Sequence, residues 1–529
     1  MIFKHAKTDK HARFLSSFEK YILPECQTGN ITFFDQAQII FTISSAKQLQ
    51  SDIAAANAEL LHDISIKKLL YLSEHFRDRS DYYYRWDFYS LDWPQHINLS
   101  RHRFPHMADC QYWATLKLGT FTSNGYYRQQ CMEHLRGVEG SLPFLILRMN
   151  DWVVQIREKA FELVPQRMRE CGLYELFNSL PMIEKVRNAR RREDAQICSV
   201  ETLAKNLIKQ KFETAPDKVF DEIHDYEIQI RNAVYRFINS NHVLTREPME
   251  RLMASERTGY GQMLLILGIF RHYGYDSVWA GKYLHAKSAV VRYHTLICRY
   301  EQEHHAWEGL QEMLLDSSVR IRYYAAYILE KCTNIDITAF YLKELEKNVS
   351  KIVLSGIGEQ GTKTELEVIR PYLEDEREQI CKAALEAYGK LAESDGEEIY
   401  WRFLFDTRPV ITRQAYRCVQ KYRISYGAQR LYEAYMQNRF GYMSDYFLNL
   451  LLSEPSWIRL PYLLTLYCDK NLPENQRLLV TEGIHSRHMY AKVSKEQAER
   501  ICSILSQNRD SIPEDIHKGI LFDLKHVVS

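Results

Sequence analysis

Three residues with metal-ligating side chains, His102, His106 and Cys110, recur at every fourth position of one aromatic-rich stretch. On a continuous helix this spacing would place two imidazole nitrogens and a thiolate on one face, and such ligands bind Zn²⁺. Pro105 interrupts the span, however, and the sequence supplies no evident fourth ligand. The stretch is better explained as a packed aromatic segment, so we predict no metal and no other cofactor.

A basic cluster stands further along the chain, at Arg187, Arg190 and Arg191. On a helix, Arg187 and Arg191 share a face and could contact phosphates. Glu193 and Asp194 follow at once, so a surface helix that balances its own charge is the competing interpretation. The chain carries 69 Lys and Arg against 68 Asp and Glu, so no overall field draws it to nucleic acid. Nucleic-acid binding is therefore the second hypothesis.

The composition favours a helical protein. The 529 residues include only 21 Gly and 14 Pro, and this scarcity of chain breakers favours long helices. The 11 Cys are scattered without a CxxC pair, which is typical of reduced thiols. The N-terminus is charged and lacks the apolar core of a signal peptide, and the densest apolar run, residues 263–270, is too short to cross a bilayer. We expect a cytoplasmic protein that does not bind membranes.

The dominant pattern of the chain is a turn followed by a helix, and residues 315–332 give its clearest copy. Asp316 opens the turn, and apolar residues then recur at helical spacing. The fifth position after the turn residue holds a β-branched residue, the sixth usually holds an arginine, and the ninth holds a small residue. Copies start at positions 151, 225, 286, 316, 375 and 406, with weaker copies between them. A period of about 30 residues with two helices per unit predicts an α-solenoid.

This pattern, together with the stretch GIGEQGTKTELEVIRPYLEDE (356–376), resembles the short repeats of the HEAT-repeat superfamily. The resemblance implies an all-α fold: a right-handed α-solenoid of HEAT-like helical hairpins with an irregular N-terminal helical region. It also implies a ladder of Asp and Arg side chains between neighbouring repeats. The arginines at the ladder position are Arg157, Arg231, Arg292 and Arg322. Cys381 and Thr412 stand at the same position and break the ladder, so we expect packing to hold the later repeats together.

The repeat array divides the chain into four predicted regions. These are an N-terminal helical cap (1–75), an aromatic-rich irregular helical segment that is either a repeat or an insertion (76–139), the HEAT-like array (140–430), and divergent C-terminal repeats with a cap (431–529).

The second helix of each unit usually lines the concave face of such an array. Its groove-facing positions should lie seven, eight and eleven residues after the turn residue. The candidates for partner binding at these positions are Tyr293, His294, Tyr323, Tyr324, Tyr327, Arg413 and Arg417. Tyrosine gives large contact area and arginine gives bidentate contacts, which suits a protein or peptide partner. The competing interpretation is that the tyrosine rings only fill space between helices. We predict a non-enzymatic scaffold that binds a protein or peptide.

The alternative is a nucleic-acid-binding HEAT-like protein, with or without the activity of a DNA glycosylase of the alkylation-repair type. Those enzymes place aromatic rings and a carboxylate in a basic concave cleft. Asp151 beside Trp152, with Arg148 and Arg157, matches this superficially. Asp151 already serves the repeat turn, and the balanced net charge argues against a duplex-binding enzyme. The sequence contains no phosphate-binding glycine loop and no GxSxG, and we assign no catalytic residue.

Overall fold

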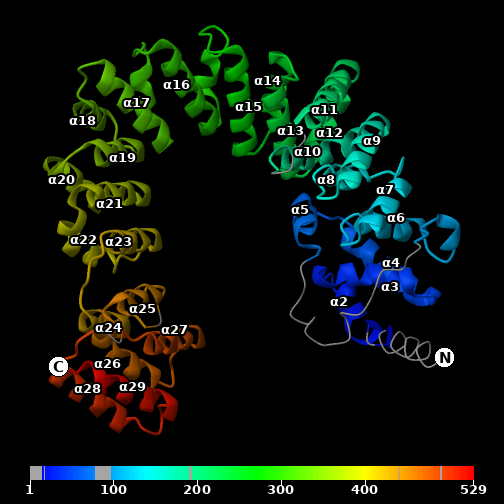
Figure 1. The fold of residues 1–529 in the computed structure, drawn as a ribbon. Helices are drawn as coiled ribbons and strands as arrows, with labels where there is room; N and C mark the ends of the chain where they lie inside the picture. Colours follow the sequence, from blue (N-terminus) through cyan, green and yellow to red (C-terminus); the bar gives the residue numbers. More distant parts are fainter. Residues whose placement is uncertain are drawn as a thin grey trace. The chain divides into compact units, whose positions relative to one another are not determined.

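The computed structural model describes residues 15–16, 18–77, 97–189, 194–439, 441–488 and 491–528 of the chain. Across these ranges the regular structure is helical, apart from an isolated β-bridge between Val493 and Val528. The chain divides into two compact units, Met1–Gln302 and Glu303–Ser529 (Figure 1). Their fold is the all-α solenoid of HEAT-like helical hairpins that the sequence predicts. The region boundaries at 75, 139 and 430 stay predictions.

The first unit begins with a less regular region and continues as helical hairpins. The first elements are the π-helix η1 (Phe18–Ile22), α2 (Leu23–Gln27), η2 (Ile31–Phe33), α3 (Phe34–Ile43), α4 (Lys47–Leu61), α5 (Ile66–His75), η4 (Arg101–Arg103), α6 (Asp109–Gly119) and α7 (Gly125–His134). The hairpins comprise α8 (Leu142–Arg148), α9 (Val154–Glu170), α10 (Leu173–Arg187), α11 (Asp194–Thr214), α12 (Pro216–Asp225), α13 (Ile228–Asn241), α14 (Arg246–Ser255), α15 (Gly259–Tyr273), η5 (Gly281–His285) and α16 (Ala289–Glu303).

The second unit is more regular. Its first part comprises η6 (Leu310–Leu315), α17 (Val319–Cys332), α18 (Ile337–Lys347), α19 (Lys351–Gln360), η7 (Lys363–Glu365), α20 (Leu366–Ile369), η8 (Arg370–Glu374), α21 (Glu378–Ala392), η9 (Glu393–Gly396), α22 (Glu397–Phe403) and α23 (Pro409–Lys421). Its last part comprises α24 (Ala428–Gln437), α25 (Ser444–Ser453), α26 (Ser456–Tyr467), α27 (Glu474–His485), α28 (Lys495–Gln507) and α29 (Glu514–Val527).

The hairpins of the second unit form two layers of helices (Figure 1). Helices α19, α21 and α23 stack on one another, and α18, α20 and α22 each pack against the helix that follows them. Gly358 allows α19 and α21 to approach closely, because a Cβ atom at this position would lie 2.5 Å from Cα of Ala387. We call the layer that contains α17, α19, α21 and α23 the second-helix layer.

Each repeat turn starts the helix that follows it, as the sequence predicts. Helices α9, α13, α16, α17, α21 and α23 all begin three residues after a predicted turn position. In the clearest copy, the carboxylate of Asp316 accepts a hydrogen bond of 2.7 Å from the Ser318 N–H. The Arg322 guanidinium donates back to the Asp316 carbonyl oxygen at 2.8 Å. Both the side chain and the backbone carbonyl of Asp316 are thus hydrogen-bonded to residues at the start of α17.

The ladder between repeats differs from the one that the HEAT resemblance implies. Arg322 bonds the backbone of its own turn, and its ion pair is with Glu359 on the next helix of the layer, at 2.5 Å. Lys390 on α21 lies 3.5 Å from the same Glu359 carboxylate, which is 1% exposed. A buried carboxylate therefore links three successive hairpins. It belongs to a glutamate within a helix, whereas the resemblance implies an aspartate of the turn in this role.

The two positions that were expected to break the ladder keep their polar contacts. Thr412 donates from its hydroxyl to the Asp406 carbonyl oxygen at 2.8 Å, the same contact that Arg322 makes in its own repeat. At Cys381 the contact comes from the next repeat. Arg408 donates to the Asp375 carbonyl oxygen at 3.1 Å and to the Cys381 sulfur at 3.2 Å. The later repeats were expected to be held mainly by packing, and these polar contacts add to that packing at both positions.

Glu256 replaces the turn aspartate before α15. It accepts hydrogen bonds from the Thr258 N–H at 2.7 Å, the Tyr235 hydroxyl at 2.7 Å and the Arg231 guanidinium at 3.0 Å. Burial alone would raise the pKa of this carboxyl group, but these donors and the Thr258 hydroxyl lower it from 4.5 to about 2. The ionised Glu256 carboxylate thus stabilises the fold, and its protonation at acidic pH should remove this stabilisation.

We expect the stability of the first unit to decrease as the pH is lowered through a range set by the pKa of Glu256. A carboxyl group whose pKa is lower in the folded state stabilises the fold above its unfolded pKa and loses that effect as pH falls through its folded pKa. Stability should therefore be lost as the pH falls from about 4.5 to about 2. Glu256→Gln should remove roughly 3 kcal/mol at pH 7 and flatten this dependence. Urea unfolding at a series of pH values measures both effects.

The matched control for this prediction is Glu247→Gln, because Glu247 is an exposed glutamate of the neighbouring helix α14. Its unfolding curves should follow those of the native chain at each pH. An equal pH dependence in the native chain and in Glu256→Gln would contradict the assignment.

Candidate functional site

The predicted tyrosines of the second unit lie on α17, on the outer surface of the second-helix layer. Tyr323 and Tyr327 are 48% and 46% exposed, and Tyr324 is half-buried. The rings of Tyr324 and Tyr327 stack with their centroids 5.9 Å apart. The Lys331 ammonium donates to the Tyr327 hydroxyl at 3.2 Å. The three rings thus form an aromatic surface on one helix, with two of them largely open to solvent.

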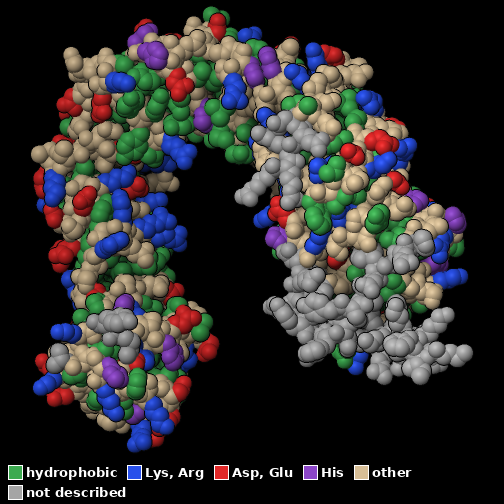
Figure 2. Space-filling model, in the orientation of Figure 1, with side chains coloured by type: hydrophobic (Ala, Val, Ile, Leu, Met, Phe, Trp, Pro, Cys, Tyr) green, Lys and Arg blue, Asp and Glu red, His purple; other side chains and the backbone are tan. Residues whose placement is uncertain are grey.

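Basic side chains continue this surface along α21 and α23. Arg413 and Arg417 on α23 are exposed one helical turn apart, and α21 and α23 also carry Lys382, Lys390 and Lys421. Figure 2 shows Lys and Arg side chains gathered over this part of the second unit. Glu386 offsets one of these five charges through an ion pair with Lys390 at 3.4 Å. We call the set Tyr323, Tyr324, Tyr327, Lys382, Lys390, Arg413, Arg417 and Lys421 the tyrosine–arginine face.

Contacts with neighbouring helices hold this face in place. Arg413 reaches the Tyr446 hydroxyl of α25 at 3.4 Å, and the rings of Tyr416 and Tyr446 lie 4.8 Å apart. A groove of about 420 Å³ runs between α17, α19, α21 and α23, and Lys382 and Glu386 line it. Among the residues of the face, Lys382 lines this groove, and the contacts of Arg413 with Tyr446 hold another part of the face in place.

Tyr293 and His294 belong to the first unit. Both lie on α16, are half-buried, and have ring centroids 5.4 Å apart. His294 lines a cavity of about 470 Å³ together with Arg236 and Glu301. These two candidates thus lie in a different unit from the tyrosine–arginine face, beside a cavity of their own.

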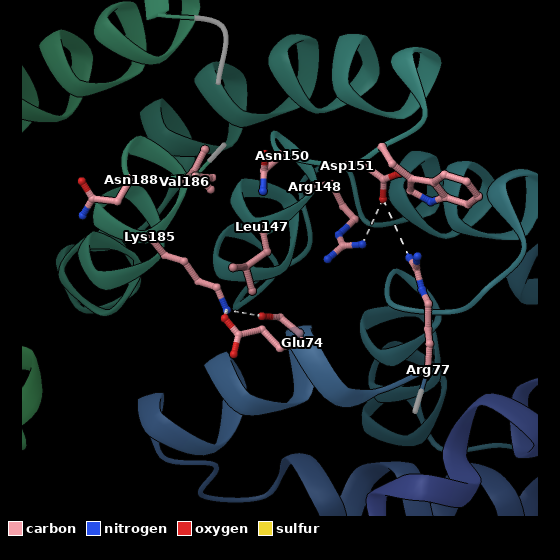
Figure 3. A pocket seen from close by; sticks show the side chains of 12 residues that line it. Glu74, Arg77, Leu147, Arg148, Asn150, Asp151, Lys185, Val186 and Asn188 are labelled. Carbon is pink, nitrogen blue, oxygen red and sulfur yellow. Dashed lines mark hydrogen bonds and ion pairs between the residues drawn. The ribbon is translucent and has the colours of Figure 1, made fainter. Parts of the chain in front are cut away.

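The other prominent site is a pocket of the first unit, of about 670 Å³, between α5, the turn after α8, and α10 (Figure 3). We call it the Asp151 pocket. The Asp151 carboxylate accepts from Arg128 at 2.9 Å and from Arg148 at 3.0 Å, and Arg77 lies 4.0 Å away. On the opposite side, Lys185 forms an ion pair with Glu74 at 2.8 Å. Three guanidinium groups therefore converge on one carboxylate.

The charge of the Asp151 cluster is only partly balanced. Arg128 is fully buried and Arg148 nearly so, and the Nε atoms of both are buried without a hydrogen-bond partner. Burial, with smaller effects of Arg77 and Arg128, lowers the pKa of Arg148 to about 10 against the opposing effect of Asp151. Burial likewise raises the pKa of Asp35, the second carboxyl group near Arg77 and Arg128. Positive charge is thus in excess at this site.

The sequence indicated part of the Asp151 pocket. It marked Asp151, Trp152 and Arg148, and the turn role expected for Asp151 is confirmed by a 3.0 Å hydrogen bond from the Val153 N–H. It gave no sign of Arg77 and Arg128, which come from the end of α5 and from α7. Arg157 donates to the Asp151 carbonyl oxygen at 2.8 Å and serves the turn.

The metal candidate does not lie on one helix. His102 lies in η4, His106 in the following turn and Cys110 in the first turn of α6. Within the described part of the chain, no group of three or more His, Cys, Asp or Glu residues is arranged to hold a metal ion. In the basic cluster, Arg187 lies 3.6 Å from Glu201, whereas Arg190 and Arg191 fall outside the described residues.

Comparisons with known proteins give little beyond the fold. No protein-family model and no curated protein matches the chain. Three similar solved structures are a triple mutant of Kap121p, Kap121p itself, and Kap121p bound to Nup53p. The first two match with TM-scores of 0.32 and 0.30, each at 10% identity over 97% of this chain and 66% of that chain. The third matches with a TM-score of 0.27 at 12% identity over 94% of this chain and 56% of that chain. The chain thus spans less than two thirds of their length, and this level of similarity carries no argument about function.

Among the described residues, every helix is too short or too polar to span a membrane.

Proposed function

We propose that this protein is a non-enzymatic scaffold that binds an acidic segment of a protein or peptide on its tyrosine–arginine face. The observation that carries the proposal is the combination of exposed Tyr323 and Tyr327 with the basic side chains of α21 and α23, among which Lys390 is paired with Glu386 and Glu359. Stacked repeats commonly bind partners on the extended concave surface of the array, because the packed helices hold the side chains at fixed spacing.

The two parts of the face have different roles in this proposal. Exposed tyrosines bury large area at low cost in side-chain entropy, and tyrosine and arginine are enriched among residues that dominate binding energy. The basic groups favour carboxylates, because a guanidinium binds a carboxylate through two parallel hydrogen bonds. A segment that carries Asp or Glu near an apolar side chain would match both parts.

A protein partner fits this face better than nucleic acid does. Glu386 lies among the basic groups, where it would face a phosphate backbone with a like charge, whereas a peptide can offer it an N–H donor. The chain as a whole has a net charge of +1, and nucleic-acid affinity rests mainly on accumulated positive charge. A gel shift across a salt series distinguishes these classes, and tight salt-sensitive binding of nucleic acid would favour the alternative.

The experiment reverses charge on α23. We expect Arg413→Glu with Arg417→Glu to weaken binding of the captured partner by about 10- to 100-fold, because two attractive contacts become repulsive. Partners are captured with the tagged full-length chain and identified by mass spectrometry. The affinity of an identified acidic segment is then measured by fluorescence anisotropy.

The control reverses the same number of charges elsewhere in the second unit. Lys343 and Lys347 are exposed one turn apart on α18, in the other helix layer, so Lys343→Glu with Lys347→Glu should leave the affinity unchanged. A second variant, Tyr323→Ala with Tyr327→Ala, should abolish capture while the helical circular dichroism spectrum is retained. Equal binding by the native chain and both face variants would contradict the proposal.

A further inference from the structure

The Asp151 pocket contains more buried positive charge than its own carboxylates can balance. Arg77, Arg128 and Arg148 surround Asp151, and Asp35 is the only second carboxylate that acts on Arg77 and Arg128 among the described groups. Lys185 and Glu74, on the other side of the pocket, neutralise each other. Buried charges in proteins are normally paired, because an uncompensated one is costly to remove from water. Among the described groups, three guanidinium groups, of which Arg77 is 33% exposed, thus face two carboxylates, which leaves a net positive charge at the site.

Unpartnered polar atoms lie in the same place. Arg148 lines the pocket, is 6% exposed and has a buried Nε–H without an acceptor. Asn150 also lines the pocket, and its buried side-chain oxygen has no donor. Figure 3 shows Asn150 between the Arg148–Asp151 side and the Lys185 side of the pocket. The pocket thus offers positive charge to an anion and an acceptor to a hydroxyl group.

Other features of the pocket suit a small ligand. Its volume of about 670 Å³ lies in the range of small-molecule sites. Trp152 lines the pocket and is 59% exposed, so its ring is open to contact with the non-ionic part of a ligand. Arg77 is fixed in direction, because its Nε–H donates to the Phe121 carbonyl oxygen at 2.8 Å.

We propose that the Asp151 pocket binds the phosphate group of a small hydroxylated molecule, with Arg77 and Arg148 facing the phosphate and Asn150 accepting from a hydroxyl. Phosphate matches paired guanidinium groups in shape and balances the net positive charge. This site lies in the first unit and does not depend on the tyrosine–arginine face of the second.

Calorimetric titration of the full-length chain with glycerol 3-phosphate, inorganic phosphate and glycerol tests the proposal. We expect saturable binding of glycerol 3-phosphate with one site per chain, and none of glycerol. Weaker binding of inorganic phosphate would assign the site to a phosphate ester, and equal binding would assign it to free phosphate; both support an oxyanion site. Absence of saturable binding of either phosphate to the native chain overturns the proposal, whatever the variants do.

Two variants with opposite expected effects on phosphate affinity test whether binding occurs in this pocket. Arg77→Gln should weaken it about 10-fold, the effect of one charge-assisted hydrogen bond. Glu74→Gln should tighten it about threefold, because Lys185 loses its counter-ion while an exposed carboxylate is removed. The control Arg136→Gln changes an exposed arginine that pairs with Glu162 outside the pocket, and should have no effect. Equal affinities in all four proteins would place the phosphate elsewhere and overturn the assignment.

Discussion

Asp151→Asn is expected to lower the free energy of unfolding by about 3–5 kcal/mol, the usual cost of removing one partner from a buried ion pair. The substitution keeps the shape of the side chain but leaves Arg128 and Arg148 facing each other without their shared carboxylate. Arg128 is fully buried and cannot reach water. The loss is measured as a lower midpoint of urea unfolding, monitored by circular dichroism.

The control is Asp225→Asn, at the equivalent turn position before α13. Asp225 is exposed, so its replacement should change stability by no more than about 0.5 kcal/mol. Similar losses in the two variants would mean that replacement of the turn aspartate itself accounts for the effect. The arginine cluster around Asp151 would then contribute nothing of its own.

Arg322→Met is expected to have an effect of similar size in the second unit. It leaves the buried Glu359 carboxylate with only Lys390 beside it, at 3.5 Å, and removes the bond to the Asp316 carbonyl oxygen. We expect a loss of about 3–5 kcal/mol. Urea unfolding of the full-length chain again provides the measurement.

A double variant tests whether the unpaired charge causes this loss. Arg322→Met with Glu359→Leu should recover much of the stability, because a buried ion pair can often be replaced by apolar groups at little cost. Arg370→Met, at an exposed arginine paired with Glu367, should behave like the native chain. A double variant that is less stable than Arg322→Met would contradict the charge-based explanation.

The repeat turns were the part of the fold most open to prediction from the sequence. An aspartate such as Asp316 or Asp406 fixes its turn through contacts within a few residues, so the helix start follows from local pattern alone. After Asp316, the predicted apolar positions Ile321, Ala325, Ile328 and Leu329 are buried, whereas Val319 in the first turn of α17 is 46% exposed. Such local rules repeat along the chain and reinforce one another.

Contacts between repeats could not be predicted in the same way. Glu359 lies 37 residues from Arg322, and nothing in the spacing distinguishes it from the glutamates of neighbouring helices. Arg128 is 23 residues from Asp151, in a stretch without a repeat pattern. Thr412 and Arg408 were missed for another reason: a hydroxyl or a neighbouring guanidinium can donate to the carbonyl that the repeat arginine usually reaches.

The Glu359 bridge also has a mechanical consequence. A stacked helical array stretches and bends through small slides of each hairpin over the next, so its stiffness is set pair by pair. Any slide that separates Glu359 from Arg322 on one side or from Lys390 on the other exposes an uncompensated charge to a dry interior. Helices α17, α19 and α21 should therefore behave as one rigid link, and when the second unit is pulled from its ends, its elasticity should reside in the hairpins beyond them.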